Sequence, residues 1–176
     1  MKKIIAFAGS NSQNSINKKL AVYAANQIND VEVDVLDLND FELPLYGIDY
    51  EIAHGIPNNA QIFLNKIKSS NGIVLSLAEH NGAYTTVFKN IFDWMSRIDG
   101  KLWNNKPMLL MSAAPGGRGG KSVLEIAQGK FPRMDANITS VFSLPFFNNN
   151  FAEEGITDKE LAQELNKAIY KFQNAI

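Results

Sequence analysis

The chain has 176 residues, which fits a single domain spanning residues 1–176, and 45 % of them are hydrophobic. Its formal net charge of −1 argues against a nucleic-acid partner or an anionic membrane surface, and no apolar run approaches the roughly 18 residues of a membrane-spanning helix. Without cysteine, disulfides, a thiolate nucleophile and a cysteine-based metal site are excluded. We expect no metal site, no membrane attachment and a cytoplasmic location.

Short apolar runs alternate with longer amphipathic segments along the chain. The apolar runs predict five strands, at residues 3–8, 31–36, 72–77, 107–111 and 138–144. Helical patterns predict five helices, at residues 15–28, 57–69, 84–97, 119–130 and 157–175. Continuous apolar runs are typical of parallel strands covered on both faces, so the pattern predicts a doubly wound α/β sandwich.

Three details of this pattern can be checked directly. Thr157 and Glu160 have the spacing of a capping box at the start of the last helix. Residues 148–150, all asparagine, are expected to form a loop, and residues 40–55 are expected to form a long connection rich in turn residues.

The loop after the first predicted strand is filled with polar donors. Residues 9–17 read GSNSQNSIN and contain no Lys or Arg. Hydroxyl, amide and backbone N–H donors beside a helix N-terminus suit a phosphate group. The alternative is that Ser15 simply caps the helix and the rest is a polar turn. The loop matches neither GxGxxG nor a P-loop, so standard dinucleotide and NTP binding lose support.

The loop after the third predicted strand suits a flat ligand. In residues 78–83, AEHNGA, Gly82 permits close backbone approach, Asn81 can donate and accept hydrogen bonds, and His80 can stack on a ring. The alternative is a turn that needs positive φ at Gly82, with His80 merely exposed and Glu79 acting as the partner of a helix dipole.

The loop after the fourth predicted strand is rich in glycine. Residues 112–120 read SAAPGGRGG, and their four glycines suit a shallow, flexible wall along one side of a planar cofactor. A mobile surface loop is the alternative interpretation. In an open parallel sheet these three loops share the edge where ligands bind.

Four segments together resemble the NADPH-dependent FMN reductase family, which includes flavin, azo, quinone and chromate reductases. They are GSNSQNSIN, LPLY at residues 43–46, AEHNGAYTTVFKNIFDW at 78–94 and NKPMLLMSAAPGGRGG at 105–120. The resemblance implies a flavodoxin-like α/β sandwich with a five-stranded parallel sheet of order 2-1-3-4-5. It also implies an FMN-dependent enzyme that passes electrons from NADPH or NADH to a small acceptor, namely a quinone, azo compound, free flavin or metal oxyanion.

The resemblance also assigns residues by position. Ser10, Ser15 and Asn17 would hold the FMN phosphate, residues 78–82 would line the isoalloxazine, and Ser112 with Gly116 would close its other side. The full expected cofactor set is Ser10, Ser12, Ser15, Ile16, Asn17, Ala78, Glu79, His80, Asn81, Gly82, Ser112 and Gly116. No catalytic side chain is assigned, because the cofactor carries the chemistry. Glu79, His80 and Arg118 are candidates for shaping the acceptor site.

Two positions depart from the family pattern. Ser12 stands where the family usually has Arg, and residues 78–80 read Ala-Glu-His in place of Pro-Glu-Tyr. Loss of the arginine removes a charge-assisted phosphate contact of roughly 1.5–3 kcal/mol. It also leaves no clear basis for a preference between NADPH and NADH.

The predicted helix 84–97 is apolar nearly all round. Phe88, Ile91, Phe92 and Met95 suit the sheet, and the remaining apolar residues Tyr84, Val87 and Trp94 need another cover. Lys89, Asn90, Asp93 and Trp94 also match a family helix motif that supports a loop and the dimer. We therefore expect a homodimer or homotetramer. The alternative is that the connection at residues 40–55 covers the outer residues.

Other functions remain open or are excluded. A receiver-like domain needs acidic residues after the first strand, where this chain has Phe7-Ala8-Gly9, and a small tyrosine phosphatase needs a cysteine. A flavodoxin-type electron carrier is the serious alternative, although such carriers are typically strongly acidic. A structural or regulatory relative without FMN is a third possibility.

Overall fold

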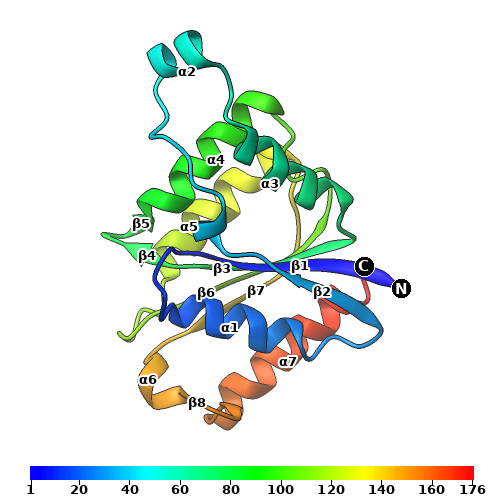
Figure 1. Cartoon of the computed structure of the whole chain (residues 1–176). Coiled ribbons are helices and arrows are strands. Elements are labelled where there is room, and N and C mark those ends of the chain that lie inside the picture. Colours follow the sequence, from blue (N-terminus) through cyan, green and yellow to red (C-terminus); the bar gives the residue numbers. More distant parts are fainter.

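Five parallel strands form the central sheet of the computed structural model, which describes all 176 residues (Figure 1). The strands are β1 (Lys2–Gly9), β2 (Val31–Val35), β3 (Gly72–Leu77), β6 (Pro107–Ala113) and β7 (Asn137–Leu144). Their order is β2-β1-β3-β6-β7, so with β6 and β7 as the fourth and fifth predicted strands the expected order is confirmed.

Helices cover both faces of the sheet (Figure 1). On one face lie α1 (Ile16–Ala25) and α7 (Lys159–Gln173); on the other lie α3 (Asn58–Ser69), α4 (Thr86–Ile98) and α5 (Lys121–Lys130). Successive side chains of β1 alternate between the two cores: Ile4 packs with α1 and α7, and Ile5 packs with the other three helices. This double burial explains the continuous apolar runs of the strands.

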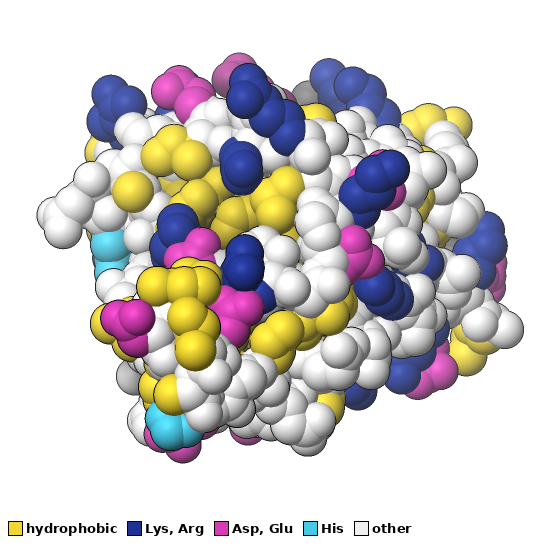
Figure 2. All heavy atoms as spheres, turned by 90° about the horizontal axis from the view of Figure 1, so that it is seen from above, with side chains coloured by type: hydrophobic (Ala, Val, Ile, Leu, Met, Phe, Trp, Pro, Cys, Tyr) yellow, Lys and Arg dark blue, Asp and Glu magenta, His cyan; other side chains and the backbone are white.

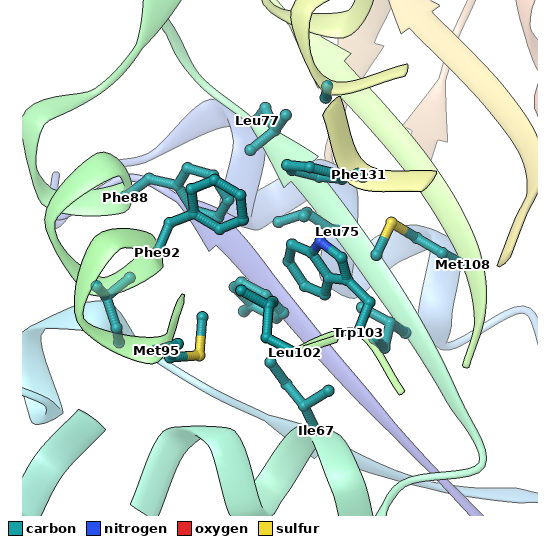
Figure 3. Close-up of a cluster of buried hydrophobic side chains, with 14 of the residues drawn as sticks. Ile67, Leu75, Leu77, Phe88, Phe92, Met95, Leu102, Trp103, Met108 and Phe131 are labelled. Carbon is teal, nitrogen blue, oxygen red and sulfur yellow. The ribbon is translucent and has the colours of Figure 1, made fainter. Parts of the chain in front are cut away.

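An aromatic cluster fills the core beneath α4 and α5 (Figure 3). Phe88 and Phe92 of α4 meet Trp103 and Phe131, and the last two rings have centroids 4.6 Å apart. Phe131 begins the short helix η2 (Phe131–Met134). Trp103 lies in a connection for which the sequence pattern predicted no core residue, yet it is fully buried.

Several local expectations were wrong. The cap of α7 is Asp158, whose carboxylate accepts a hydrogen bond from the Leu161 N–H at 2.9 Å, so Thr157 and Glu160 form no capping box. The expected asparagine loop forms the short helix α6 (Phe147–Asn150). The long connection at residues 40–55 is confirmed; it begins at the last residue of η1 (Leu38–Asp40) and contains a helix that was not predicted, α2 (Ile48–His54), which projects from the body of the molecule (Figure 1).

Two small hairpins were not predicted. They are β4 (Glu79–His80) with β5 (Ala83–Tyr84), and β8 (Phe151–Ala152) with β9 (Gly155–Ile156). Strands of two residues are too short to show a period in the sequence. No helix combines the length and hydropathy that a membrane span requires.

Candidate functional site

A cleft of about 260 Å³ lies at the carboxyl edge of the sheet, between the loops that follow β1, β3 and β6. Its lining residues are Ser10, Ser12, Asn14, Ser15, Ile16, Asn17, Ala78, Glu79, His80, Ala113, Ala114 and Pro115. The structure therefore brings the expected residues of the first loop together with residues 78–80. Asn81, Gly82, Ser112 and Gly116 do not line this cleft.

The cleft opens onto the start of α1. Ser15 caps the helix, because its hydroxyl oxygen accepts a hydrogen bond from the Lys18 N–H at 3.1 Å. The N–H groups of Ile16 and Asn17 have no acceptor within the chain. Both the free N–H groups and the helix dipole therefore favour an anion at this end of the cleft.

The side chain of Asn17 is buried, and both its oxygen and its nitrogen bond within the protein. Its Oδ1 accepts hydrogen bonds from the Ser76 hydroxyl at 2.7 Å and from the Ala113 N–H at 2.8 Å, and its Nδ2 donates to the Ala113 carbonyl at 3.0 Å. Ser76 lies on β3 and Ala113 ends β6. Asn17 thus joins α1 to two strands, and its backbone N–H remains free.

The loop after β1 is bonded at Asn11 to the short helix η1. Asn39 donates to the Asn11 carbonyl at 3.2 Å, and Asp37 caps η1 and pairs with Lys18. Burial opposes ionisation of Asp37, but hydrogen bonds from Lys18 and Asn39 outweigh it, so the pKa of this carboxyl lies below its ordinary value. Lys18, the lysine nearest the start of α1, is therefore already paired, and no Lys or Arg side chain lines the cleft.

The hairpin of β4 and β5 forms the next wall. Asn81 and Gly82 at its tip both have positive φ, 52° and 77°, as a tight type I′ turn requires. Glu79 accepts a hydrogen bond from the Val123 N–H in the first turn of α5 at 3.0 Å, which confirms its predicted alternative role as a helix-dipole partner. His80 is exposed. The hairpin is therefore anchored at Glu79, and the exposed side chain of His80 borders the cleft.

The glycine-rich loop after β6 is shaped by close packing. Ser112 is fully buried, and its hydroxyl donates to the Leu77 carbonyl at 2.7 Å. Gly120, with φ of 75°, caps α5 so close to Ser112 that a Cβ would overlap the serine Oγ. Gly116 has open space around it. The turn from β6 into α5 is thus closely packed where α5 begins. Its first residues, 113–115, border the cleft.

The segment before α2 is fastened to α4. The Asn90 Nδ2 donates to the Pro44 carbonyl at 3.0 Å, its Oδ1 accepts from the Tyr46 N–H at 2.8 Å, and the Trp94 Nε1 donates to the same carbonyl of Pro44 at 2.8 Å. Trp94 is therefore covered by its own chain, and not by a second subunit as expected. The alternative cover, the connection at residues 40–55, is confirmed for this residue.

No group of three or more His, Cys, Asp or Glu side chains is arranged to hold a metal ion.

The sequence of this chain matches a known protein family. The model of the NADPH-dependent FMN reductase family matches residues 2–148. This chain belongs to that family. The match includes all three loops of the cleft, so the expected FMN cofactor, NAD(P)H co-substrate and oxidoreductase activity are confirmed at the level of the family.

Individual relatives agree with the family assignment. A protein of Oryza sativa subsp. japonica named probable NADPH:quinone oxidoreductase 1 is 31 % identical over 131 residues, which cover 72 % of this chain and 65 % of the rice protein. An uncharacterised Mycoplasma pneumoniae protein is 27 % identical, with 81 % of this chain and 86 % of that protein covered. The structure of the flavoenzyme FerB from Paracoccus denitrificans has a TM-score of 0.77 and 22 % identity, and covers 99 % and 96 % of the two chains. FerB confirms the flavodoxin-like fold of this reductase.

Replacing Asn17 should test its role as a structural tie in the reductase. Asn17→Ala would leave the Ser76 hydroxyl and both backbone groups of Ala113 without partners, and an unsatisfied buried group costs about 1–3 kcal/mol. We expect the free energy of unfolding in urea to fall by about 3 kcal/mol. Asn14→Ala, in the same loop, is the control and should change it by less than about 0.5 kcal/mol. Equal stability of the two variants would contradict the assigned role.

Proposed function

We propose that the FMN phosphate binds at the start of α1. The observation that carries this proposal is the pair of free N–H groups of Ile16 and Asn17 beside the Ser15 hydroxyl, at the positive end of a helix and inside the cleft. Ser10 and Ser12 add hydroxyl groups to the same wall. The residues present therefore fit a phosphate bound by neutral donors.

The planar ring of FMN would lie between the hairpin and the β6 turn. Ala78, His80 and the backbone of residues 113–115 border the space between these two elements. Asn81, Gly82 and Gly116 flank this space outside the cleft, and Ser112 supports it from within the core. Bound FMN supplies the hydride and electron chemistry, and the protein holds and orients it.

We infer that this reductase passes electrons from NADH or NADPH to a quinone. The rice relative's name supports a quinone acceptor, and azo compounds, free flavin and metal oxyanions are the other candidate acceptors. Because the cleft is a single site, donor and acceptor would use the same open side of it in turn. A weak preference between the two donors is expected, since Ser12 replaces the usual arginine. We place the reaction in the cytoplasm, where reduced nicotinamide is available.

Anaerobic mixing of the FMN-loaded protein with NADH or NADPH tests the enzyme function. Both donors should bleach the flavin absorbance at about 450 nm, a property of the cofactor. Steady-state rates with a quinone should give parallel double-reciprocal lines, as a substituted-enzyme mechanism requires. If neither donor bleaches the flavin, the protein is an electron carrier of the flavodoxin type and not an NAD(P)H oxidoreductase.

Restoring the family arginine tests the phosphate site. Ser12→Arg would add one charge-assisted hydrogen bond to the phosphate, so we expect FMN to bind about tenfold more tightly, equivalent to about 1.4 kcal/mol. Quenching of FMN fluorescence measures the affinity. Lys130→Arg, far from the cleft, is the control for added guanidinium. An unchanged affinity of Ser12→Arg for FMN, together with an unchanged affinity for riboflavin, would place the phosphate elsewhere.

We propose further that two copies of this chain associate through the arm that carries α2. Leu45 and Ile52 are 74 % and 78 % exposed, and Ile48, Tyr50 and Ile56 are also exposed. The arm is not loose, because Glu51 pairs with Arg97 of α4 at 2.8 Å and accepts a hydrogen bond from Tyr46 at 3.1 Å. Figure 2, which views this face, shows hydrophobic side chains gathered among charged ones. A rigid apolar projection of this kind is typical of an interface between subunits.

Charging the arm should prevent this association. Light scattering of the wild-type protein should give at least twice the monomer mass of 19.5 kDa at micromolar concentration. The double variant Leu45→Asp and Ile52→Asp should give the monomer mass, because burying two carboxylates costs several kcal/mol. Ile126→Asp, at an exposed position on α5, is the control. A monomeric wild-type protein would contradict the proposal.

A further inference from the structure

A second, larger groove lies on the other side of α1 from the sheet. It has a volume of about 860 Å³ and runs between α1 and the segment that holds α6 and the β8–β9 hairpin, which lie next to each other in Figure 1. From Ser15 to Asn26 it follows the helix over roughly 16 Å, at 1.5 Å per residue. Neither the fold nor the cofactor phosphate requires this space to be open.

The groove has a fixed aromatic wall. Phe151 stacks on Phe147 with ring centroids 4.7 Å apart and meets Tyr23 edge-on at 5.4 Å. The hairpin is pressed against α1 at Gly155, whose φ is 117° and where a Cβ would overlap the Tyr23 ring. Tyr23 and Phe151 are only partly buried although they pack on a core, so their rings border both the core and the groove.

This groove is continuous with the cofactor cleft. Ser15 lines both of them. On the opposite wall, the N–H of Phe147, a groove residue, donates to the carbonyl of Ala114, a cleft residue, at 3.0 Å. The two spaces therefore meet at Ser15, and a ligand long enough to span both would pass from the cleft into the groove beside this residue.

Charge in the groove suits a phosphorylated nucleoside. Lys19 is exposed and makes no ion pair, whereas Lys18 is already paired with Asp37. Glu153 lies on the opposite side of the groove and can accept hydrogen bonds from ribose hydroxyls, as acidic residues do in dinucleotide sites. Aromatic rings stack on bases, and the free lysine lies on α1 one turn from Ser15.

We propose that this groove binds the adenosine diphosphate half of NADH or NADPH while the nicotinamide half occupies the cofactor cleft. The identity of the ligand rests on the proposed function, in which NADH or NADPH is the electron donor. The base lies against Phe151 and Tyr23, a phosphate contacts Lys19, and the ribose contacts Glu153. With one lysine free of an ion pair, Lys19, and one carboxylate, Glu153, on its walls, the groove accepts a 2′-hydroxyl and tolerates a 2′-phosphate, so we expect a weak preference between the two donors.

Titration calorimetry with ADP-ribose, which lacks the nicotinamide ring, tests the groove directly. ADP-ribose should bind the FMN-loaded protein, and Phe151→Ala should weaken that binding at least tenfold. Lys19→Glu, an exposed substitution that leaves the core untouched, should weaken it at least fivefold. Lys130→Glu, at an exposed position on α5, is the matched control and should leave it unchanged. Equal binding of ADP-ribose to wild type and Lys19→Glu, or no binding at all, would overturn the proposal.

Kinetics with a truncated donor give a second test. Reduced nicotinamide mononucleotide lacks the adenosine half, so it cannot use the groove. The ratio of kcat/KM for NADH to kcat/KM for this donor should fall at least fivefold in Lys19→Glu and stay constant in Lys130→Glu. A constant ratio in both variants would overturn the proposal. If ADP-ribose binds as expected but no donor bleaches the flavin, the nucleotide groove stands and the proposed oxidoreductase function fails.

Discussion

The side chain of Asn17 holds the carboxyl edge of the sheet together, and the candidate site depends on this single amide. The ends of parallel strands leave backbone groups without partners, and at this edge Asn17 satisfies both groups of Ala113 and the hydroxyl of Ser76. Because Asn17 is the second residue of α1, these bonds also fix where the helix begins. The free N–H groups of the first turn are consequently held in the cleft, beside the ends of β3 and β6.

Charged side chains near this edge of the sheet are already paired, so an anion bound there would be held by neutral donors. Asp37 forms an ion pair with Lys18, and Glu79 accepts a hydrogen bond from the Val123 N–H in the first turn of α5. Of the two helices that begin beside the cleft, α1 presents the unpaired N–H groups of two successive residues, Ile16 and Asn17, whereas in α5 Lys121, Val123 and Leu124 already donate. The start of α1 is therefore the position that most favours an anion, because its donors are backbone N–H groups at a helix end and not charged side chains.

The sequence predicted the sheet order and the three loops of the cleft because both follow from strong periodicity and from topology. It did not separate ligand contacts from structural contacts within those loops. Asn17 and Ser112 carry the same donors and acceptors that suit a cofactor, but their side chains bond to strands far along the chain, which no local pattern reveals. Trp94 was assigned to a subunit interface for the same reason, since its cover comes from Pro44 and Tyr46 in a connection without periodicity.

The two exposed features, the arm with α2 and the groove beside α1, lie on opposite sides of the sheet. The arm with α2 is anchored to α4, whereas the aromatic groove is built on α1 and the β8–β9 hairpin across the sheet (Figure 1). A second subunit that covers the arm would leave the groove open, because α1 and α4 pack in different cores. Association of subunits on one side and entry of a dinucleotide on the other are thus compatible.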